Sequence, residues 1–350
     1  MSEQWESAAF KSRVDEMLRD FVAREADQLT GIDPALAPVA GQLEAAVAEG
    51  KRLRAAFCYW GWRAAGQPDS DALLRAATSM ELVHAAAMVH DDLIDDSPLR
   101  HGRPTAHVAL RAAVRRRPRA VSAARSLAML VGDLLMSLAG QLFATSGLPA
   151  AYLARARPLW SALARELVAG ECLEILHTGA DPDTARSLKV IRYKTAKYTV
   201  EQPLLIGGLL GGAGERLREG YSAYGLPLGE AFQLRDDLLG LFGDPGQTGK
   251  ANADDVCAHR PTALLSETWR IADEDEREQM RALFGRRDLD SDGLDTVREL
   301  MRRLKAPDRI EDMITARVET ALDALHELDV PAHAAAALTA LAHTATVRWS

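Results

Sequence analysis

Aromatic residues and cysteines are scarce in this sequence. Phe, Trp and Tyr make up 5% of the 350 residues although 47% are hydrophobic, and Ala and Leu are abundant. Ala and Leu are strong helix formers, so the composition favours helices over strands. The three cysteines, Cys58, Cys172 and Cys257, are an odd number and lack metal-site spacing. They predict buried thiols in a reducing compartment.

Signals for secretion, membrane insertion and nucleic-acid binding are also missing. The first six residues do not contain a basic stretch followed by an apolar one, as a secretory signal would. No uncharged apolar run reaches about 18 residues, the length that suggests a membrane span. The formal net charge of −8 disfavours a general affinity for nucleic acid. We therefore expect a cytoplasmic protein without a transmembrane segment or a nucleic-acid partner.

Helical periodicity runs through the chain, and neither strand-like alternation nor a convincing internal repeat is present. Apolar residues recur at helical spacing over residues 5–29, and a break follows at residues 31–34. Further helices are expected at residues 38–49 and up to Trp62. The pattern predicts one all-α domain over residues 1–350, built from about a dozen helices.

An acidic cluster ends the segment of residues 81–96, which contains neither Gly nor Pro and is predicted to be helical. Asp91 and Asp95 are four residues apart, so they stack on one face, with Asp92 beside them. Carboxylates held this closely repel each other and need a compensating charge. A hard cation such as Mg²⁺ suits that task and often shares its shell with phosphates. The same face carries three residues one and two turns earlier: His84, Ala87 and Met88.

A second acidic pair lies in the second half of the chain, on another apolar helical pattern. Asp236 and Asp237 follow Phe232 and Gln233 on this pattern. The two acidic helices could face each other across one cavity. Together they resemble the Asp-rich motifs of the trans-isoprenyl (polyprenyl) diphosphate synthases, such as geranylgeranyl and farnesyl diphosphate synthases. The resemblance covers about residues 50–262.

This resemblance implies both a fold and a reaction. The fold is the isoprenoid synthase fold, an all-α bundle around a central cavity, in which two Asp-rich helices hold three Mg²⁺ ions against an allylic diphosphate. The reaction is the transfer of an allylic prenyl group to isopentenyl diphosphate. The allylic C–O bond ionises, the cation alkylates the double bond, and a proton is lost. The enzyme is expected to be a homodimer.

The resemblance also implies roles for individual residues. The metal ligands would be Asp91, Asp95 and Asp236, and the catalytic set would also include Asp92, Asp237 and Lys194. Isopentenyl diphosphate would be bound by Lys51, Arg54, His84 and His101. The allylic diphosphate would be bound by Arg100, Lys194, Thr195 and Lys250. The substrate-binding set is completed by Gln233 and Arg260.

Several positions depart from the family pattern. His101 stands where the family has a second Arg, and a neutral His offers one N–H where Arg offers a bidentate fork. Arg103 could substitute for that Arg from nearby. The other departures are Ala55 in place of a Pro, Gly240 in place of a third acid, and His259 in place of a Gly before Arg260. Gly170, Glu171 and Glu174 match positions where the family often has Gly-Gln and Asp, and they are expected near the cavity.

Three alternative interpretations remain open from the sequence. An HD-type metal phosphohydrolase is suggested by His84 and the pair His90-Asp91, but it leaves the second acidic pair unexplained. A non-catalytic subunit of a heteromeric synthase is suggested by His101 and Gly240, although such a subunit would be expected to lose the aspartates or Lys194. A terpene cyclase of the same fold would not need the isopentenyl diphosphate ligands.

Two charged motifs have simpler explanations than a binding site. Residues 288–299 fit the EF-hand loop expression, but Asp295 occupies a position that is normally apolar. We expect this segment to be an acidic interhelical loop whose aspartates cap the next helix. The basic run at residues 115–119 is expected to be a solvated loop.

The first Asp-rich helix bears on product length. In the family, a bulky aromatic residue four or five positions before the first Asp shortens the product, and these positions are Ala87 and Ala86 here. By helical geometry Ala87 points with Asp91, whereas Ala86 points away. Geranylgeranyl diphosphate (C20) or a longer product is therefore expected, and farnesyl diphosphate (C15) alone is disfavoured. The cavity floor is expected among adaptable methionines: Met88, Met80 and Met129 to Met136.

Ala87→Phe should shorten the product by at least one isoprene unit, because its ring would fill the space below Asp91. Chain-length analysis of the products made by the variant and the parent enzyme measures this effect. An unchanged product distribution would show that the growing tail does not pass Ala87.

Overall fold

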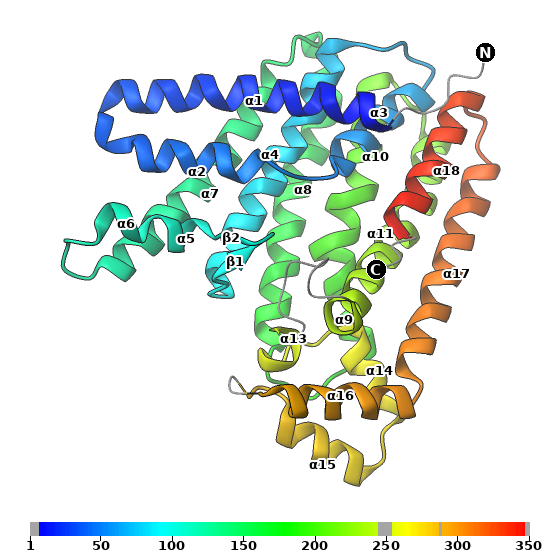
Figure 1. Ribbon diagram of the computed structural model, residues 1–350. Coiled ribbons are helices and arrows are strands. Elements are labelled where there is room, and N and C mark those ends of the chain that lie inside the picture. The colour runs from blue at the N-terminus through cyan, green and yellow to red at the C-terminus, as the bar shows by residue number, and fades with distance from the viewer. Residues whose placement is uncertain (1–6, 244–253, 287–288, 347–350) are drawn as a thin grey trace. The chain divides into compact units, whose positions relative to one another are not determined.

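The structure, a computed structural model, describes residues 7–243, 254–286 and 289–346, which are almost entirely helical (Figure 1). The chain divides into two compact units. Unit 1 is Met1–Ala156 with Gly207–Gly212, and unit 2 is Arg157–Ile206 with Ala213–Ser350. The all-α prediction is confirmed, with more helices than the expected dozen because several are only one turn long. The expectation of a single domain stays a prediction.

Unit 1 is built around two long helices, α4 and α7, which pack against each other. Helices α1 and α2 lie side by side, and α3 packs on α4. Figure 1 shows α1 and α2 as the blue pair. In chain order its elements are α1 (Ser7–Ile32), η1 (Pro34–Leu36), α2 (Ala37–Val47), α3 (Leu53–Ala64), α4 (Asp71–Ile94), β1 (Leu99–Arg100), β2 (Arg103–Pro104), α5 (Ala106–Ala109), α6 (Arg111–Val114), α7 (Ala120–Ala144) and the start of α8 (Ala150–His177).

Helix α4 forms where the sequence predicted the first Asp-rich helix. Ser70 caps its start by accepting a hydrogen bond from the N–H of Leu73. The helix ends at Ile94, two residues earlier than predicted, because Asp96 adopts a left-handed φ of 54°. The N–H of Asp95 still donates to the carbonyl of Asp91 at 2.9 Å. Asp91 and Asp95 therefore keep their i to i+4 relation although Asp95 lies just outside the helix.

A short antiparallel hairpin follows α4. Leu99 pairs with Pro104 and Arg100 with Arg103. The two connecting residues, His101 and Gly102, have φ angles of 50° and 74°. Such a two-residue turn needs positive φ at both positions, which Gly adopts freely and His more readily than most other residues.

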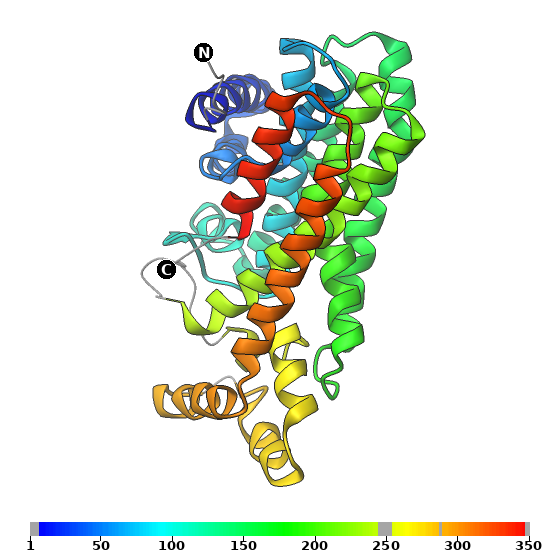
Figure 2. The ribbon, with the colours of Figure 1, turned by 90° about the vertical axis from the view of Figure 1, so that its right-hand side faces the viewer.

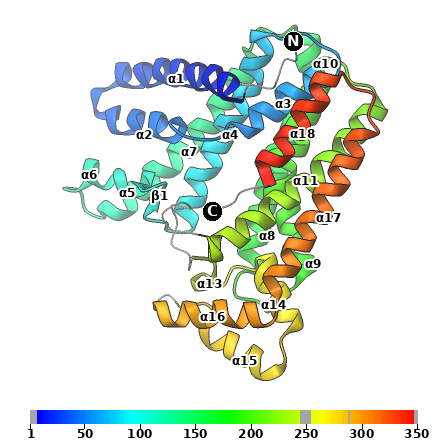
Figure 3. The ribbon, with the colours of Figure 1, turned by 45° about the vertical axis from the view of Figure 1, so that its right-hand side comes forward.

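Unit 2 has α11 at its centre, packed against η2, a π-helix, and against α17. Figure 2 shows α17 beside α11, and Figure 3 shows α14, α15 and α16 gathered at one end of the unit. The apolar core joins residues of α11, α14, α16 and α17. The elements are the rest of α8, α9 (Thr184–Val190), η2 (Ile191–Glu201), α10 (Gln202–Gly211, which ends in unit 1), α11 (Glu215–Phe242), α13 (Asp254–Cys257), α14 (Ala263–Ile271), α15 (Glu274–Leu283), α16 (Ser291–Arg303), α17 (Ala306–His326) and α18 (Ala332–Thr346).

The EF-hand-like stretch belongs to a helix. Asp290 caps α16 by accepting a hydrogen bond from the N–H of Gly293 at 2.9 Å, and α16 begins at Ser291. Residues 291–299 of the stretch are therefore helical, so the expectation of an interhelical loop is wrong for them, whereas the expected capping by an aspartate is confirmed at Asp290. Asp288 lies outside the described residues.

The structure also bears on two further expectations, the burial of the cysteines and the lack of a membrane span. Cys58 is buried, but Cys172 is exposed and Cys257 is half-buried, so the prediction of buried thiols is correct only for Cys58. By length and composition alone, α4 and α7 could cross a membrane. The apolar window of α4 is 72% buried within the protein and that of α7 is 44% buried. The burial of α4 is that of a core helix.

Candidate active site

The predicted site residues fall in both units. In unit 1 the last turn of α4 presents Asp91 and Asp92, both buried. Arg100 of the hairpin meets them. Its Nε donates to Asp92 Oδ1 at 2.7 Å and its second terminal nitrogen donates to Asp91 Oδ2 at 3.0 Å. We expected Arg100 at the allylic diphosphate, and here it compensates the charge of the aspartates.

The carboxylates around Arg100 explain why its buried guanidinium stays charged. Burial disfavours the charged guanidinium, but the hydrogen bond with Asp92 and the charges of Asp92, Asp91 and Asp95 outweigh it and raise the pKa of Arg100. The guanidinium is therefore permanently charged. It forms a fixed positive centre beside the predicted metal ligands.

The basic loop of residues 50–54 is held by its central residue. Arg52 has a left-handed φ of 58°, and its buried guanidinium turns back to Asp15 Oδ1 at 2.7 Å. It also donates to the carbonyls of Glu49 at 2.9 Å and Val47 at 2.6 Å. Arg52 therefore secures the loop, whereas its neighbours Lys51 and Arg54 are the predicted phosphate ligands.

His84 lies two helical turns before Asp91 on α4, and positively charged residues surround it. Burial lowers the pKa of His84 well below its usual value, and the charges of Arg54, Arg100, Arg52 and His101 lower it further. His84 is therefore neutral at neutral pH and presents one N–H donor. Three of the charges that act on the pKa of His84 thus belong to other predicted site residues of unit 1, namely Arg54, Arg100 and His101.

Arg103, the proposed substitute for the missing Arg, reaches the same loop. It forms an ion pair of 2.9 Å with Glu49, and both side chains are more than half exposed. Such an exposed pair is weak. Arg103 therefore lies next to the loop that carries Lys51, paired with Glu49.

In unit 2 the predicted Lys194-Thr195 motif lies on the π-helix η2. Long π-helices are rare, and local ones often mark functional sites. Glycines allow η2 to approach its neighbours closely. A Cβ atom on Gly170 of α8 would lie 2.3 Å from the backbone nitrogen of Lys194, and one on Gly229 of α11 would lie 2.5 Å from Cα of Ala196.

Lys194 is held by two carboxylates of α8. Its ammonium lies 2.9 Å from Glu171 and 2.5 Å from Glu174. Both glutamates therefore contact a predicted catalytic residue within unit 2, and their expected place near the cavity stays a prediction. Their i to i+3 spacing on α8 places them on one face, so they receive Lys194 together.

A hydrogen-bonded chain joins η2 to the second Asp-rich helix. Thr195 donates to Gln233 Oε1 at 2.8 Å, and Gln233 donates to Asp237 Oδ1 at 2.9 Å. Burial raises the pKa of Asp237 to about 8, against the hydrogen bond from Gln233, and the charges of Asp255 and Asp236 raise it further. Gln233 thereby connects Thr195 to the acidic pair.

Two predicted cations of the second half of the chain remain, Arg260 and Lys250. Arg260 donates to Asp255 Oδ1 at 3.1 Å, which places it beside one of the carboxylates that perturb Asp237. Lys250 lies outside the described residues.

The carboxylates fit a divalent cation that is completed by substrate. Among the described residues, no three His, Cys, Asp or Glu side chains gather closely enough to hold a metal ion by themselves. Mg²⁺ needs few protein ligands, because it keeps waters and takes oxygens from substrate phosphates. Burial is the main cause of the raised pKa of Asp237, and the charges of Asp255 and Asp236 add to it, so three carboxyl groups lie near one another at this end of α11. Crowded carboxylate oxygens are the donors that a hard cation prefers.

The predicted chain-length residues differ in burial as helical geometry required. Ala86 is fully buried in unit 1, whereas Ala87 and Met88 are half-buried like His84. Met80 is also buried.

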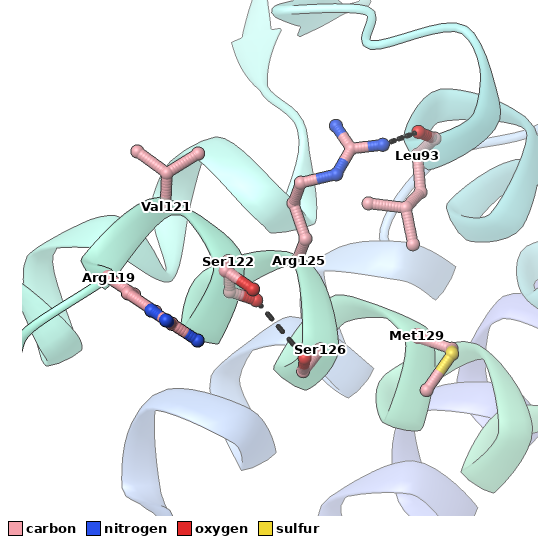
Figure 4. A pocket seen from close by; sticks show the side chains of 7 residues that line it. All are labelled: Leu93, Arg119, Val121, Ser122, Arg125, Ser126 and Met129. Carbon is pink, nitrogen blue, oxygen red and sulfur yellow. Dashed lines mark hydrogen bonds between the residues drawn. The ribbon is translucent and has the colours of Figure 1, made fainter.

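Met129 is exposed and lines a surface pocket of about 600 Å³ on unit 1, so it does not close an internal cavity (Figure 4). The pocket contains none of the predicted catalytic or substrate-binding residues. It is lined by Leu93, Arg119, Val121, Ser122, Arg125, Ser126 and Met129.

The sequence did not identify two residues that organise unit 1. The role of Arg52 was hidden because it stands in a basic run whose members look equivalent. Glu81, which accepts a hydrogen bond from the backbone of α3, looked like an ordinary helix residue. A single acidic residue in an otherwise apolar helical run was the signal available for Glu81.

Comparison with known proteins gives the family. The model of the polyprenyl synthetase family matches residues 39–301. The chain belongs to this family. Geranylfarnesyl diphosphate synthase of Aeropyrum pernix is 30% identical over 257 residues, which cover 72% of this chain and 74% of that protein. A (2E,6E)-farnesyl diphosphate synthase of Mycobacterium tuberculosis is 34% identical, but the match spans only 57% of that protein and 64% of this chain.

Solved structures agree with the family. A geranylgeranyl pyrophosphate synthase from Corynebacterium glutamicum, complexed with isoprenyl diphosphate and magnesium, superposes with a TM-score of 0.92 at 31% identity. The match covers 97% of this chain and 99% of that one. The isoprenoid synthase fold implied by the sequence motifs is thereby confirmed.

Family membership disfavours the phosphohydrolase interpretation, and the geometry agrees. His90 Nε2 lies 3.2 Å from the carbonyl of Met129 and 3.4 Å from Asp133, both on α7. His90 thus packs against α7, whereas His84 faces the basic cluster. These two histidines do not converge on one metal site.

His101→Arg should lower the Michaelis constant for isopentenyl diphosphate by about tenfold, because a bidentate donor replaces a single N–H. Steady-state kinetics with isopentenyl diphosphate as the varied substrate measures the effect. His101→Asn is the matched control, since Asn also tolerates positive φ but adds no fork. An unchanged or higher constant in His101→Arg would place His101 away from that diphosphate, or show that Arg103 already serves it.

Proposed function

We propose that this protein is a chain-elongating prenyltransferase that condenses isopentenyl diphosphate with an allylic prenyl diphosphate. The observation that carries the proposal is the pairing of Arg100 with Asp91 and Asp92 of the first Asp-rich helix in a member of the polyprenyl synthetase family. The family relatives and the structural match to a geranylgeranyl pyrophosphate synthase support it.

The chemistry requires stabilising a departing diphosphate while an allylic cation forms. Mg²⁺, three ions in this proposal, would supply positive charge to the diphosphate and would be held by Asp91, Asp95 and Asp236. Arg100 contributes a fixed guanidinium next to Asp91. Preorganised charge of this kind is commonly the largest contribution to catalysis.

Lys194 and Thr195 would bind the allylic diphosphate from η2. The ion pairs of Lys194 with Glu171 and Glu174 fix the position of its ammonium before substrate arrives. The ammonium has three N–H donors, so it can remain with a glutamate while it contacts a phosphate oxygen. Lys250 and Arg260 complete the proposed cations for this half of the site.

Isopentenyl diphosphate would be bound in unit 1 by Lys51, Arg54, His84 and His101. Neutral His84 donates one hydrogen bond and adds no charge of its own. The gathering of His84 with Arg54 and His101 favours a second diphosphate site, which a terpene cyclase does not need. The retention of the aspartates and of Lys194 disfavours a non-catalytic subunit.

The proposed product is geranylgeranyl diphosphate, with longer prenyl chains second. The relatives named above make products of different length, so the assignment rests on the small side chain of Ala87. This residue is half-buried on the face of α4 that carries Asp91, and it cannot obstruct a growing tail. We also propose a cytoplasmic location.

A direct assay tests the function. Incubation with isopentenyl diphosphate and a C5, C10 or C15 allylic diphosphate should give a longer prenyl diphosphate with Mg²⁺ and none with a chelator. Asp91→Ala and Asp236→Ala should each lower turnover by several orders of magnitude, since the leaving group loses its stabilisation. Asp20→Ala and Asp312→Ala, at exposed positions on α1 and α17, are the controls. Near-normal turnover in Asp91→Ala or Asp236→Ala would refute the site.

We further propose that the protein is a homodimer. Apolar side chains are exposed on α7, at Val121, Met129 and Leu130, and on α8, at Val168 and Leu176. A two-fold interface would remove such surfaces from water.

Light scattering at micromolar concentration should therefore give twice the mass of the chain. Leu130→Glu should shift the protein toward the monomer, because it would bury a charge in the interface, whereas Ser137→Glu is the exposed polar control on the same helix. A monomeric mass for the parent protein would contradict the proposal.

A further inference from the structure

Helix α3 starts at Leu53, within the basic loop of residues 50–54, and lacks a side-chain cap of its own. Its N-cap residue, Arg52, is in the left-handed conformation and makes no side-chain hydrogen bond to the first turn. The first backbone N–H groups of a helix have no partner within the helix. One of them, at Ala55, donates to Oε1 of Glu81 on α4 at 2.9 Å.

Glu81 suits this role physically. It is 3% exposed, and a buried carboxylate is stable only when it is hydrogen-bonded. The N-terminus of α3 offers both an N–H donor and the positive end of a helix dipole. The contact therefore stabilises both partners, and it connects α3 to the helix that carries His84 and Asp91.

The basic loop is consequently held from two sides. Arg52 attaches it to Asp15 and to the carbonyls of residues 47 and 49, and Glu81 attaches the residue that follows Arg54. Lys51 and Arg54 lie between these two attachments. Glu81 and His84 are three residues apart on α4, so the same helical face that fixes the loop also presents the imidazole.

The contact depends on the residue at position 55. Ala55 supplies the N–H, whereas the Pro that is usual there in the family has none, and its ring would occupy the space of the hydrogen. The hydrogen bond is thus available because this chain departs from the family pattern.

We propose that Glu81 is a positioning residue for the isopentenyl diphosphate site, acting through the N–H of Ala55 on Lys51 and Arg54. The inference rests on the proposed function and extends it to a residue that does not touch substrate. It predicts that removing either partner of the hydrogen bond weakens binding of isopentenyl diphosphate while the allylic half of the reaction is unaffected.

Steady-state kinetics of four variants tests the proposal. Glu81→Leu and Ala55→Pro should each raise the Michaelis constant for isopentenyl diphosphate by about tenfold, the usual consequence of one lost buried hydrogen bond to a charged group. The turnover number and the constant for the allylic substrate should stay within about twofold. Glu81→Gln should behave like the parent, since its Oε1 still accepts, and Ala55→Ser retains the N–H as a control.

Two further measurements complete the test. Combining Glu81→Leu with Ala55→Pro should have no larger effect than either change alone, because both remove the same contact. Hydrogen exchange of the Ala55 amide should accelerate in Glu81→Leu and not in Glu81→Gln. This readout does not depend on catalysis.

The outcomes separate the inference from the proposed function. An unchanged constant for isopentenyl diphosphate in Glu81→Leu or in Ala55→Pro would overturn the positioning role, as would a parallel loss for both substrates. If Glu81→Leu does not fold, Ala55→Pro decides the question alone. Parent enzyme that does not consume isopentenyl diphosphate would instead overturn the proposed function.

Discussion

Negative charge held on helices must be compensated, and this constraint bears on the Asp-rich helix of each unit. Asp91 and Asp92 end α4 side by side and are buried, so they depend on the guanidinium of Arg100. The hairpin that carries Arg100 returns directly after α4 and places the compensating charge there. At the end of α11, burial raises the pKa of Asp237, and the charges of Asp255 and Asp236 raise it further. Among the described residues, neither acidic end gathers three ligands that could hold a metal ion by themselves.

Positively charged side chains are also held in fixed positions in each unit. In unit 1, Arg52 secures the basic loop through Asp15 and the carbonyls of residues 47 and 49. In unit 2, Lys194 is fixed between two glutamates on a π-helix that approaches its neighbours at glycines. A diphosphate carries several negative charges and would be received by groups whose positions are already set. Such preorganisation limits the reorganisation that binding would otherwise require.

Much of the helical organisation followed from local sequence. Apolar periodicity over residues 5–29 and 38–49 gave helices close to α1 and α2, and the run before Asp91 gave α4. The boundaries were less accurate, since Asp96 ends α4 through its backbone conformation and not through a helix-breaking residue. The hairpin escaped notice because two-residue strands are too short to show an alternating pattern. The capping role of Asp290 could be predicted, because it depends only on its immediate neighbours.

The sequence by itself determined the all-α class and the two Asp-rich helices, because periodicity and motif spacing are local properties. The resemblance of its motifs to the family pattern supplied the candidate site residues. Only the tertiary structure decided the partners of these residues. It brought Arg100 into ion pairs with Asp91 and Asp92, and Lys194 into ion pairs with Glu171 and Glu174. It also joined Glu81 to the N–H of Ala55 by a hydrogen bond. Each of these contacts joins separate elements, and which charges meet depends on how those elements pack, which no local pattern encodes.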